Sequence, residues 1–162
     1  MTTLFDAQKF VGDFARSMNA KEPETLLRYY ADNAELWDPS YPAPIRGKAA
    51  IRESIEKWSA AFSELKMNVK DIIQSGNKVA ITMEVTARNT GEMEAGPGET
   101  FPVTNKTATL QVAEILTIEN GKITRDYTYF DVMGMLVQLG LAPGAELASG
   151  TPQHAGSPKL GR

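Results

Sequence analysis

The chain has 162 residues, of which 42% are hydrophobic and 23% charged, and its formal net charge is −3. These values are typical of one globular domain with its own hydrophobic core. The weak negative charge provides no electrostatic basis for binding nucleic acid or an anionic membrane. No apolar run approaches the roughly 20 residues that a membrane-spanning helix needs. We therefore expect no nucleic acid and no membrane among its partners.

The inventory of side chains narrows the chemistry further. The chain contains no cysteine, and its single histidine, His154, lies in a segment rich in glycine, proline and serine. Disulfides, thiolate nucleophiles and Ser-His-Asp catalysis are excluded, and no metal site built from histidine or cysteine is expected. Without a cofactor, carboxylates, tyrosine and lysine remain for proton transfer. The N-terminus lacks the basic start and apolar core of a signal peptide, so we expect a cytoplasmic protein.

The first 65 residues predict three helices and one short strand. A helix is expected over residues 4–18, and a second begins near Pro23, where a missing N–H is tolerated. Residues 33–38 predict a short strand that is stopped by the prolines after it. A third helix begins at Gly47, and its apolar residues recur at helical intervals: Ile51, Ile55, Trp58, Phe62 and Leu65.

The apolar pattern then changes to period two, which is typical of strands. Strands are expected near residues 67–73, 78–89, 106–118 and 122–130. The connection over residues 90–105 is rich in Gly, Glu and Pro and is interpreted as a long loop. Residues 1–141 are expected to form the domain, and residues 142–162 a Gly/Pro/Ser-rich C-terminal tail. Helices followed by strands in hairpin succession predict an α+β fold with helices on one face of an antiparallel sheet.

One carboxylate occupies a conspicuous position in the last part of the domain. A predicted strand with Ile123, Tyr127 and Tyr129 at alternating positions runs into an amphipathic helix that ends near Gly140, and Asp131 lies at the junction. Aspartate is a preferred N-cap residue. A carboxyl beside aromatic side chains in a pocket would instead have a raised pKa that suits acid/base catalysis. Both interpretations of Asp131 stay open.

Three strings in the same order resemble a known family. YADNAELWDPSYPAPIRGKAAIRESIEKWSAAF, PVTNKTATLQVAEILTIENGKI and YFDVMGMLVQLG are similar to SnoaL-like polyketide cyclases, within the nuclear transport factor 2-like (ketosteroid isomerase-like) superfamily. The resemblance covers roughly residues 5–141. It implies a cone-shaped, curved antiparallel sheet, with three N-terminal helices and a short C-terminal helix around a central cavity. It also implies a homodimer formed through the open face of the sheet.

The resemblance assigns a role to Asp131, which matches by position the aspartate that acts as general acid/base in the aldol ring closure of these cyclases. The family's histidine on the preceding long strand would fall near Leu110 or Gln111, and this chain has none there. In ketosteroid isomerases a base aspartate has a loose positional counterpart in Asp38. Because Asp38 precedes a proline, a turn-forming role is the simpler interpretation.

The remaining candidates are residues that could line a ligand pocket. Glu84 shares a strand face with Thr86, and Gln111 is able to donate a hydrogen bond to a ligand carbonyl. Each of these side chains could equally be solvated, and each aromatic candidate could be plain core. The aromatic candidates are Trp37, Tyr41, Trp58, Phe62, Tyr127 and Tyr129.

Two functions are consistent with these observations. The first is a cofactor-independent enzyme that uses Asp131 in acid/base chemistry on an apolar, oxygenated small molecule such as a polyketide or terpenoid. Aldol cyclisation is the specific expectation, with isomerisation or epoxide opening as related reactions. The alternative is a non-catalytic module of the same fold that binds a small ligand or dimerises.

Overall fold

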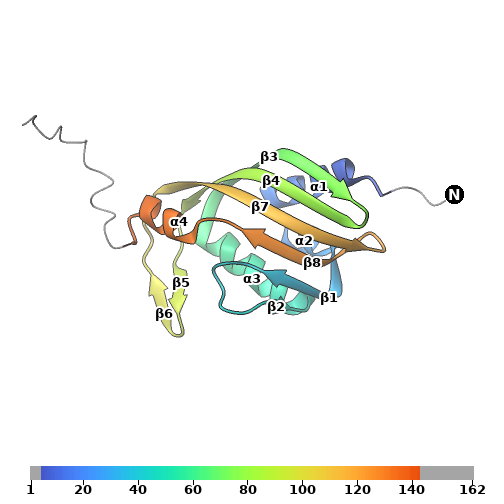
Figure 1. The fold of residues 1–162 in the computed structure, drawn as a ribbon. Helices are drawn as coiled ribbons and strands as arrows, with labels where there is room; N and C mark the ends of the chain where they lie inside the picture. The colour runs from blue at the N-terminus through green and yellow to red at the C-terminus, as the bar shows by residue number, and fades with distance from the viewer. Residues whose placement is uncertain (1–4, 143–162) are drawn as a thin grey trace, which may run out of the picture.

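A computed structural model describes residues 5–142 of the chain (Figure 1). Residues 143–162 of the expected tail lie outside this range. The elements in chain order are α1 (Ala7–Asn19), α2 (Pro23–Leu27), β1 (Tyr30–Trp37), β2 (Ile45–Arg46), α3 (Lys48–Ala61), β3 (Phe62–Ser75), β4 (Lys78–Asn89), β5 (Met93–Gly96), β6 (Glu99–Phe101), β7 (Thr107–Glu119), β8 (Lys122–Tyr129) and α4 (Val132–Leu139). Within the described range no helix is long and apolar enough to cross a membrane.

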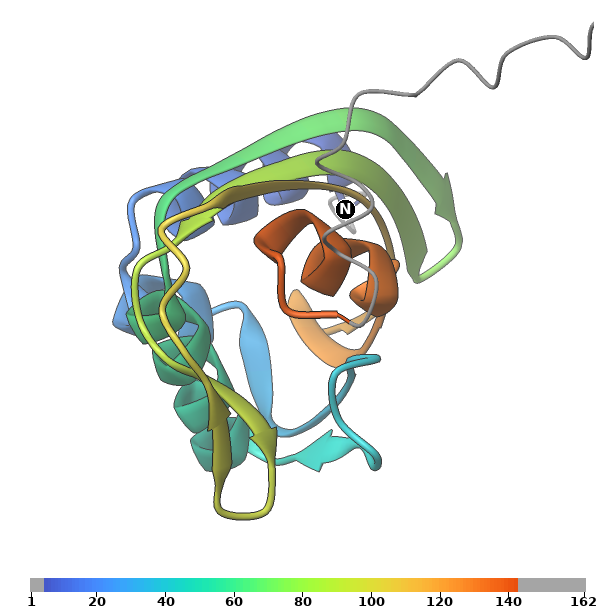
Figure 2. The same cartoon turned by 90° about the vertical axis from the view of Figure 1, so that its left-hand side faces the viewer.

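The main sheet has six strands in the order β2-β1-β8-β7-β4-β3. Its neighbours are antiparallel except for β1 and β8, which run parallel. The sheet curls strongly, with α1 and α3 along its concave side and α4 near the open end of the curve (Figure 2). The α+β fold with a curved, mainly antiparallel sheet is thereby confirmed, and within this sheet the β1–β8 pair departs from the expected antiparallel pairing.

The helix predicted to begin at Gly47 ends four residues earlier than its apolar pattern implies. Phe62 adopts an extended backbone, and β3 begins there. The carbonyl of Ala61, left free at the end of α3, accepts hydrogen bonds from the backbone N–H groups of Thr90 and Gly91 and from the side chain of Asn89. These three donors satisfy the last carbonyl of the helix and fix the corner between α3 and the sheet.

The segment over residues 90–105, expected to be a loop, contains a two-stranded sheet. Strands β5 and β6 pair antiparallel, with Met93 opposite Phe101. The expectation of a structureless loop is therefore wrong. Asn89 anchors the base of this hairpin, because its fully buried side chain donates to the carbonyl of Gly91 and accepts from both the N–H and the hydroxyl of Thr104.

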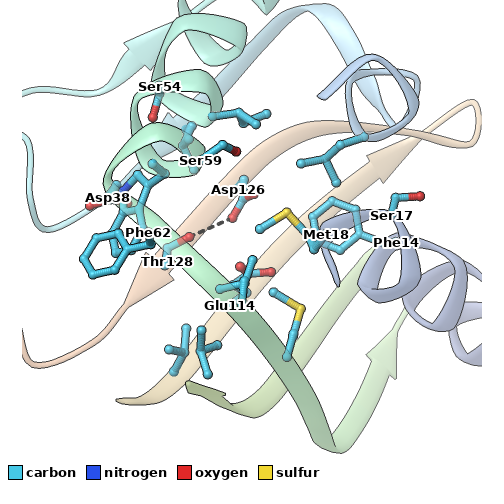
Figure 3. A pocket seen from close by; sticks show the side chains of 18 of the residues that line it. Phe14, Ser17, Met18, Asp38, Ser54, Ser59, Phe62, Glu114, Asp126 and Thr128 are labelled. Carbon is cyan, nitrogen blue, oxygen red and sulfur yellow. Dashed lines mark hydrogen bonds between the residues drawn. The ribbon is translucent and has the colours of Figure 1, made fainter. Parts of the chain in front are cut away.

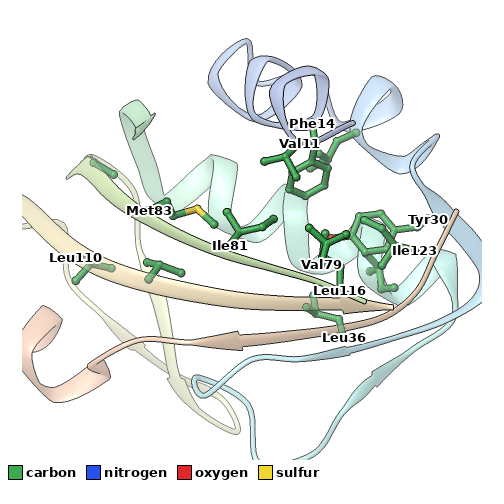
Figure 4. Close-up of a cluster of buried hydrophobic side chains, with 14 of the residues drawn as sticks. Val11, Phe14, Tyr30, Leu36, Val79, Ile81, Met83, Leu110, Leu116 and Ile123 are labelled. Carbon is green, nitrogen blue, oxygen red and sulfur yellow. The ribbon is translucent and has the colours of Figure 1, made fainter. Parts of the chain in front are cut away.

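The hydrophobic core lies between the concave face of the sheet and the helices (Figure 4). Every second residue of β4 and β7 points into it, as period-two burial requires. Val11 and Phe14 of α1 close it from the helical side. The inward residues of the two central strands are Val79, Ile81, Met83 and Ala87 on β4, and Ala108, Leu110, Val112, Leu116 and Ile118 on β7.

A β-bulge changes which residues of β8 face inward. Ile118 pairs with Ile123, yet Thr117 pairs with Arg125, so Thr124 is an extra residue on β8. One inserted residue reverses the alternation of faces beyond it. Ile123 therefore points inward together with Asp126, whereas Tyr129 is 52% exposed.

Candidate active site

A cavity of about 150 Å³ lies between the helices and the concave face of the sheet (Figure 3). Its walls are mainly apolar. It is bordered by the turn between α1 and α2, where Lys21 and Glu22 are exposed. The walls include Phe14, Met18, Trp58, Phe62, Met83 and Phe130. Besides the exposed Glu22, three less exposed carboxyl side chains line this space, namely Asp38, Glu114 and Asp126, and in an apolar surrounding each needs a partner or a proton.

Asp126 lies on β8 just beyond the bulge and is 1% exposed. Its Oδ2 accepts a hydrogen bond of 2.7 Å from the hydroxyl of Tyr30, and its Oδ1 accepts one of 3.3 Å from the hydroxyl of Thr128. Burial raises the pKa of Asp126 from 3.8 to about 6, although both hydrogen bonds act in the opposite direction. A carboxylate with this pKa is ionised at neutral pH and can accept a proton.

Glu114 lies on β7 in the middle of an apolar strand face, between Val112 and Leu116, and is 8% exposed. Its Oε2 has no hydrogen-bond partner among the described residues. Burial, followed by the nearby charges of Asp126 and Asp38, raises the pKa of Glu114 well above 4.5. Glu114 is therefore the carboxyl of this site that keeps its proton most strongly and can donate it.

Asp38 follows the last residue of β1 and is the third carboxyl of the cavity. Its Oδ1 accepts a hydrogen bond of 2.7 Å from the backbone N–H of Ser40. Burial raises its pKa above 3.8, although this hydrogen bond acts against the change. The turn-forming interpretation of Asp38 is thus correct in part, but the same side chain also faces the cavity.

The strand register explains why these carboxyls meet. Glu114 on β7 is paired with Thr128 on β8, and Leu36 on β1 is paired with Asp126 on β8. Asp38 comes two residues after Leu36 and so lies on the Thr128 side of that pair. Paired residues on neighbouring strands are about 4.5–5.5 Å apart. Glu114 and Asp38 consequently flank β8 from opposite sides at the level of Thr128, and Asp126 lies two residues earlier on the same strand.

Asp131 does not take part in this arrangement. It is exposed and is the N-cap of α4, where its Oδ1 accepts a hydrogen bond of 2.8 Å from the backbone N–H of Gly134. It is not among the residues that line the cavity. This placement corrects the expectation that Asp131 faces a pocket and leaves its capping role, which stabilises a helix by about 1 kcal/mol.

The other predicted site residues divide between the two faces of the sheet. Trp58 and Phe62 line the cavity, with their rings stacked at 4.6 Å. Tyr127 stacks on Trp37, which is 40% exposed, at 5.8 Å. Trp37, Tyr41, Tyr127 and Tyr129 are absent from the cavity lining. These four aromatic side chains are thus not brought to the site.

Glu84 and Gln111 are paired across β4 and β7, and the amide of Gln111 donates a hydrogen bond of 3.1 Å to the Glu84 carboxylate. Their neighbours on these strands, Met83 and Val112, point into the core. Because successive strand residues alternate between faces, Glu84 and Gln111 lie on the outer face. The outward interpretation of Glu84 is therefore the one that the structure supports, and Gln111 does not reach the cavity.

Among residues 5–142, no group of three or more acidic or histidine side chains has the arrangement of a metal site.

Comparison with known proteins identifies the family. A family model described as SnoaL-like domain matches residues 11–126. A provisional polyketide cyclase from Pseudomonas putida KT2440 is 20% identical with a TM-score of 0.70, over 83% of this chain and 98% of that one. TsrD from Streptomyces laurentii is 21% identical with a TM-score of 0.70, over 83% and 95%.

A further similar structure is a protein of ketosteroid isomerase-like fold from Catenulispora acidiphila DSM 44928, in complex with trimethylamine. It is 18% identical with a TM-score of 0.69, over 91% of this chain and all of that one. No curated protein matches the chain. At these identities the solved structures establish the fold alone, whereas the family model covers more than two thirds of the chain. The chain belongs to the family of SnoaL-like domains.

Proposed function

We propose that the protein is a cofactor-independent enzyme that moves a proton on a small, mainly apolar molecule with a carbonyl group. The observation that carries this proposal is the pair of buried carboxyls, Asp126 and Glu114, which face one apolar cavity and differ in their tendency to hold a proton. Two acidic groups whose environments separate their pKa values are suited to the roles of base and acid.

The roles follow from the geometry. Asp126, ionised above about pH 6, removes a proton from the carbon next to the carbonyl of the substrate. The protonated carboxyl of Glu114 donates a hydrogen bond to the carbonyl oxygen and so stabilises the negative charge that develops there. The bond between carbon and hydrogen breaks, its electron pair forms the enolate, and the proton resides on Asp126.

Two outcomes are open to this enolate. If Asp126 returns the proton to another carbon, the result is an isomerisation. If the enolate carbon attacks a second carbonyl of the same molecule, a carbon–carbon bond forms, and the new alkoxide takes the proton from Asp126. The second outcome is the aldol cyclisation expected from the resemblance, and the apolar walls of the cavity suit a folded polyketide or terpenoid chain.

The proposal is tested by exchange of the protons next to the carbonyl of a cyclic ketone in deuterium oxide, followed by proton NMR. The wild-type chain is expected to accelerate the exchange, and Asp126→Asn to lower this acceleration about 10²–10⁴-fold. Asp131→Asn is the matched control, since it removes the same type of charge outside the cavity. Equal exchange by wild type and Asp126→Asn contradicts the role of Asp126. Binding of the ketone without any acceleration identifies a non-catalytic module instead.

We further propose that two copies associate through the outer face of the sheet and that the protein acts in the cytoplasm. Exposed apolar side chains on β1, β7 and β8, namely Trp37, Ile115 and Tyr129, support this contact. Light scattering of the wild-type chain should report a dimer, and Ile115→Asp should report a monomer with an unchanged circular dichroism spectrum. A monomeric wild-type chain contradicts the association, and cell fractionation tests the location.

A further inference from the structure

The geometry points to a substrate that carries an amine: we propose that Asp38 binds the ammonium group of a compact amino ketone whose carbonyl reaches Asp126 and Glu114. This inference rests on the proposed function, because it names the class of molecule on which those two carboxyls act. The proposed proton transfer does not use Asp38, which lies deeper in the cavity wall than the exposed Glu22 at its border.

The charges of the cavity are unbalanced. Asp38, Glu114 and Asp126 line it, and none of them forms a salt bridge to a lysine or arginine within residues 5–142. Lys21, the lysine of the lining, donates its ammonium to the backbone carbonyl of Phe62 at 2.8 Å. Anions without a cationic partner in a mainly apolar cavity are unfavourable, and a positively charged ligand at Asp38 would reduce this imbalance.

A second observation indicates that a polar ligand completes the site. The Oε2 atom of Glu114 is buried and has no partner among the described residues, and its carboxyl points into the cavity (Figure 3). An unsatisfied buried polar atom destabilises a fold by about 1–3 kcal/mol, so its presence needs an explanation. A ligand carbonyl that accepts the proton of Glu114 provides one. The polar groups of the ligand must then reach both Glu114 and Asp38, which flank β8.

The aromatic lining of the cavity also suits a cation. Trp58, which lines the cavity together with Asp38, stacks on Phe62 and makes an edge contact of 6.2 Å with Phe130. The faces of aromatic rings, indole above all, attract ammonium groups. The Oδ1 atom of Asp38 accepts a hydrogen bond from the backbone N–H of Ser40. In the proposed complex its Oδ2 atom accepts a hydrogen bond from the ammonium group of the ligand. An ammonium group in this position contacts a carboxylate and an aromatic wall at once.

Binding of three matched ligands to the full chain tests the inference. Benzylamine, benzyl alcohol and benzoate have the same ring and differ in charge, and near neutral pH benzylamine is a cation. Binding is followed by the fluorescence of Trp58 in a Trp37→Phe background, since these are the only two tryptophans of the chain. We expect benzylamine to bind about tenfold more tightly than benzyl alcohol, as a hydrogen bond to a charged group implies, and benzoate most weakly.

The variant Asp38→Asn keeps the shape of the side chain and its acceptor for Ser40. It should bring the ratio of the benzylamine and benzyl alcohol affinities close to one. Four outcomes would each overturn the inference. With Asp38 present, they are equal affinities for benzylamine and benzyl alcohol, tightest binding of benzoate, or no detectable binding of benzylamine. The fourth is an unchanged ratio of the benzylamine and benzyl alcohol affinities in Asp38→Asn. The ligand series needs no variant of Asp38, so it remains decisive if Asp38→Asn does not fold.

The failure of this inference is distinguishable from the failure of the proposed function. If a neutral ketone shows exchange that depends on Asp126 but benzylamine is not preferred, the enzyme proposal stands. The inference that the substrate carries an amine is then refuted. A preference for benzylamine that depends on Asp38, without exchange by the wild-type chain, establishes the amine site and refutes the catalytic roles.

Discussion

Replacing Asp126 by asparagine should stabilise the folded chain at alkaline pH while it removes the proposed base. Burial raises the pKa of Asp126 from 3.8 to about 6. A carboxyl whose pKa is higher in the folded than in the unfolded state contributes stability that is fully present below about pH 4. That contribution is lost as the pH rises through about 6. Above this range the fold holds an ionised carboxylate in an apolar cavity.

The size of the effect follows from the two pKa values. A difference of about 2 between them corresponds to ~3 kcal/mol, since one pKa unit is equivalent to 1.36 kcal/mol. Asparagine has the same shape, has no charge to bury, and keeps an oxygen that accepts from the hydroxyl of Tyr30. The loss of the charge at position 126 also eases ionisation of Glu114, which acts in the same direction. Relative to wild type, Asp126→Asn should therefore gain up to ~3 kcal/mol between about pH 4 and pH 8.

Urea unfolding followed by circular dichroism at several pH values measures this gain. Asp131→Asn is the control, because asparagine is also a preferred N-cap, and its free energy of unfolding should stay within about 0.5 kcal/mol of wild type. The free energies of unfolding of wild type and Asp126→Asn should differ more at alkaline than at acidic pH. If their difference is the same at both, Asp126 is not an uncompensated buried acid, and the argument for its role as a base fails.

Three further predictions test single contacts. Tyr30→Phe removes a hydroxyl that favours the ionised form of Asp126, so a carboxyl carbon NMR titration should show a higher pKa for Asp126; an unmoved midpoint would contradict this. Asn89→Ala removes the four hydrogen bonds of a fully buried side chain and should lower the free energy of unfolding by about 2–4 kcal/mol, measured in urea. Gly134→Ala would place a Cβ 2.4 Å from the Asp131 carboxylate, so it should destabilise α4 by about 1 kcal/mol, and a gain in stability would show that the cap is dispensable.

Period-two patterns in the sequence were sufficient for most of the sheet. β4 has the predicted bounds, β7 is shifted by one residue at both ends, and β8 ends one residue earlier. The same pattern could have revealed Glu114, because it alternates with Leu110, Val112, Leu116 and Ile118 on one strand face. An acid in such a position is buried whenever the strand is regular. Gln111, which lies near the position of the family's histidine, is one residue out of phase with the inward face.

Asp126 could not be placed in the same way. In a regular strand, Ile123 shares its face with Tyr127 and Tyr129, and Asp126 would be solvated. The extra residue Thr124 reverses this pattern, brings Asp126 into the cavity and turns both tyrosines outward. A bulge depends on the pairing with the neighbouring strand, which periodicity along one strand does not report. The end of α3 was missed for a related reason, since its terminal carbonyl is satisfied by residues about 28 positions later in the chain.

The sign of a stability change separates the two kinds of carboxylate in this chain. Asp131 is satisfied by the N–H of Gly134, so its loss should weaken the fold. Asp126 and Glu114 lie where leucine or methionine would pack, and their ionised forms are unfavourable there. Substitutions that neutralise them should strengthen the fold, so folding gives no reason for their presence. Side chains that oppose the fold and share one cavity are better explained by what they do to a ligand, and this is why the proposed chemistry is assigned to Asp126 and Glu114.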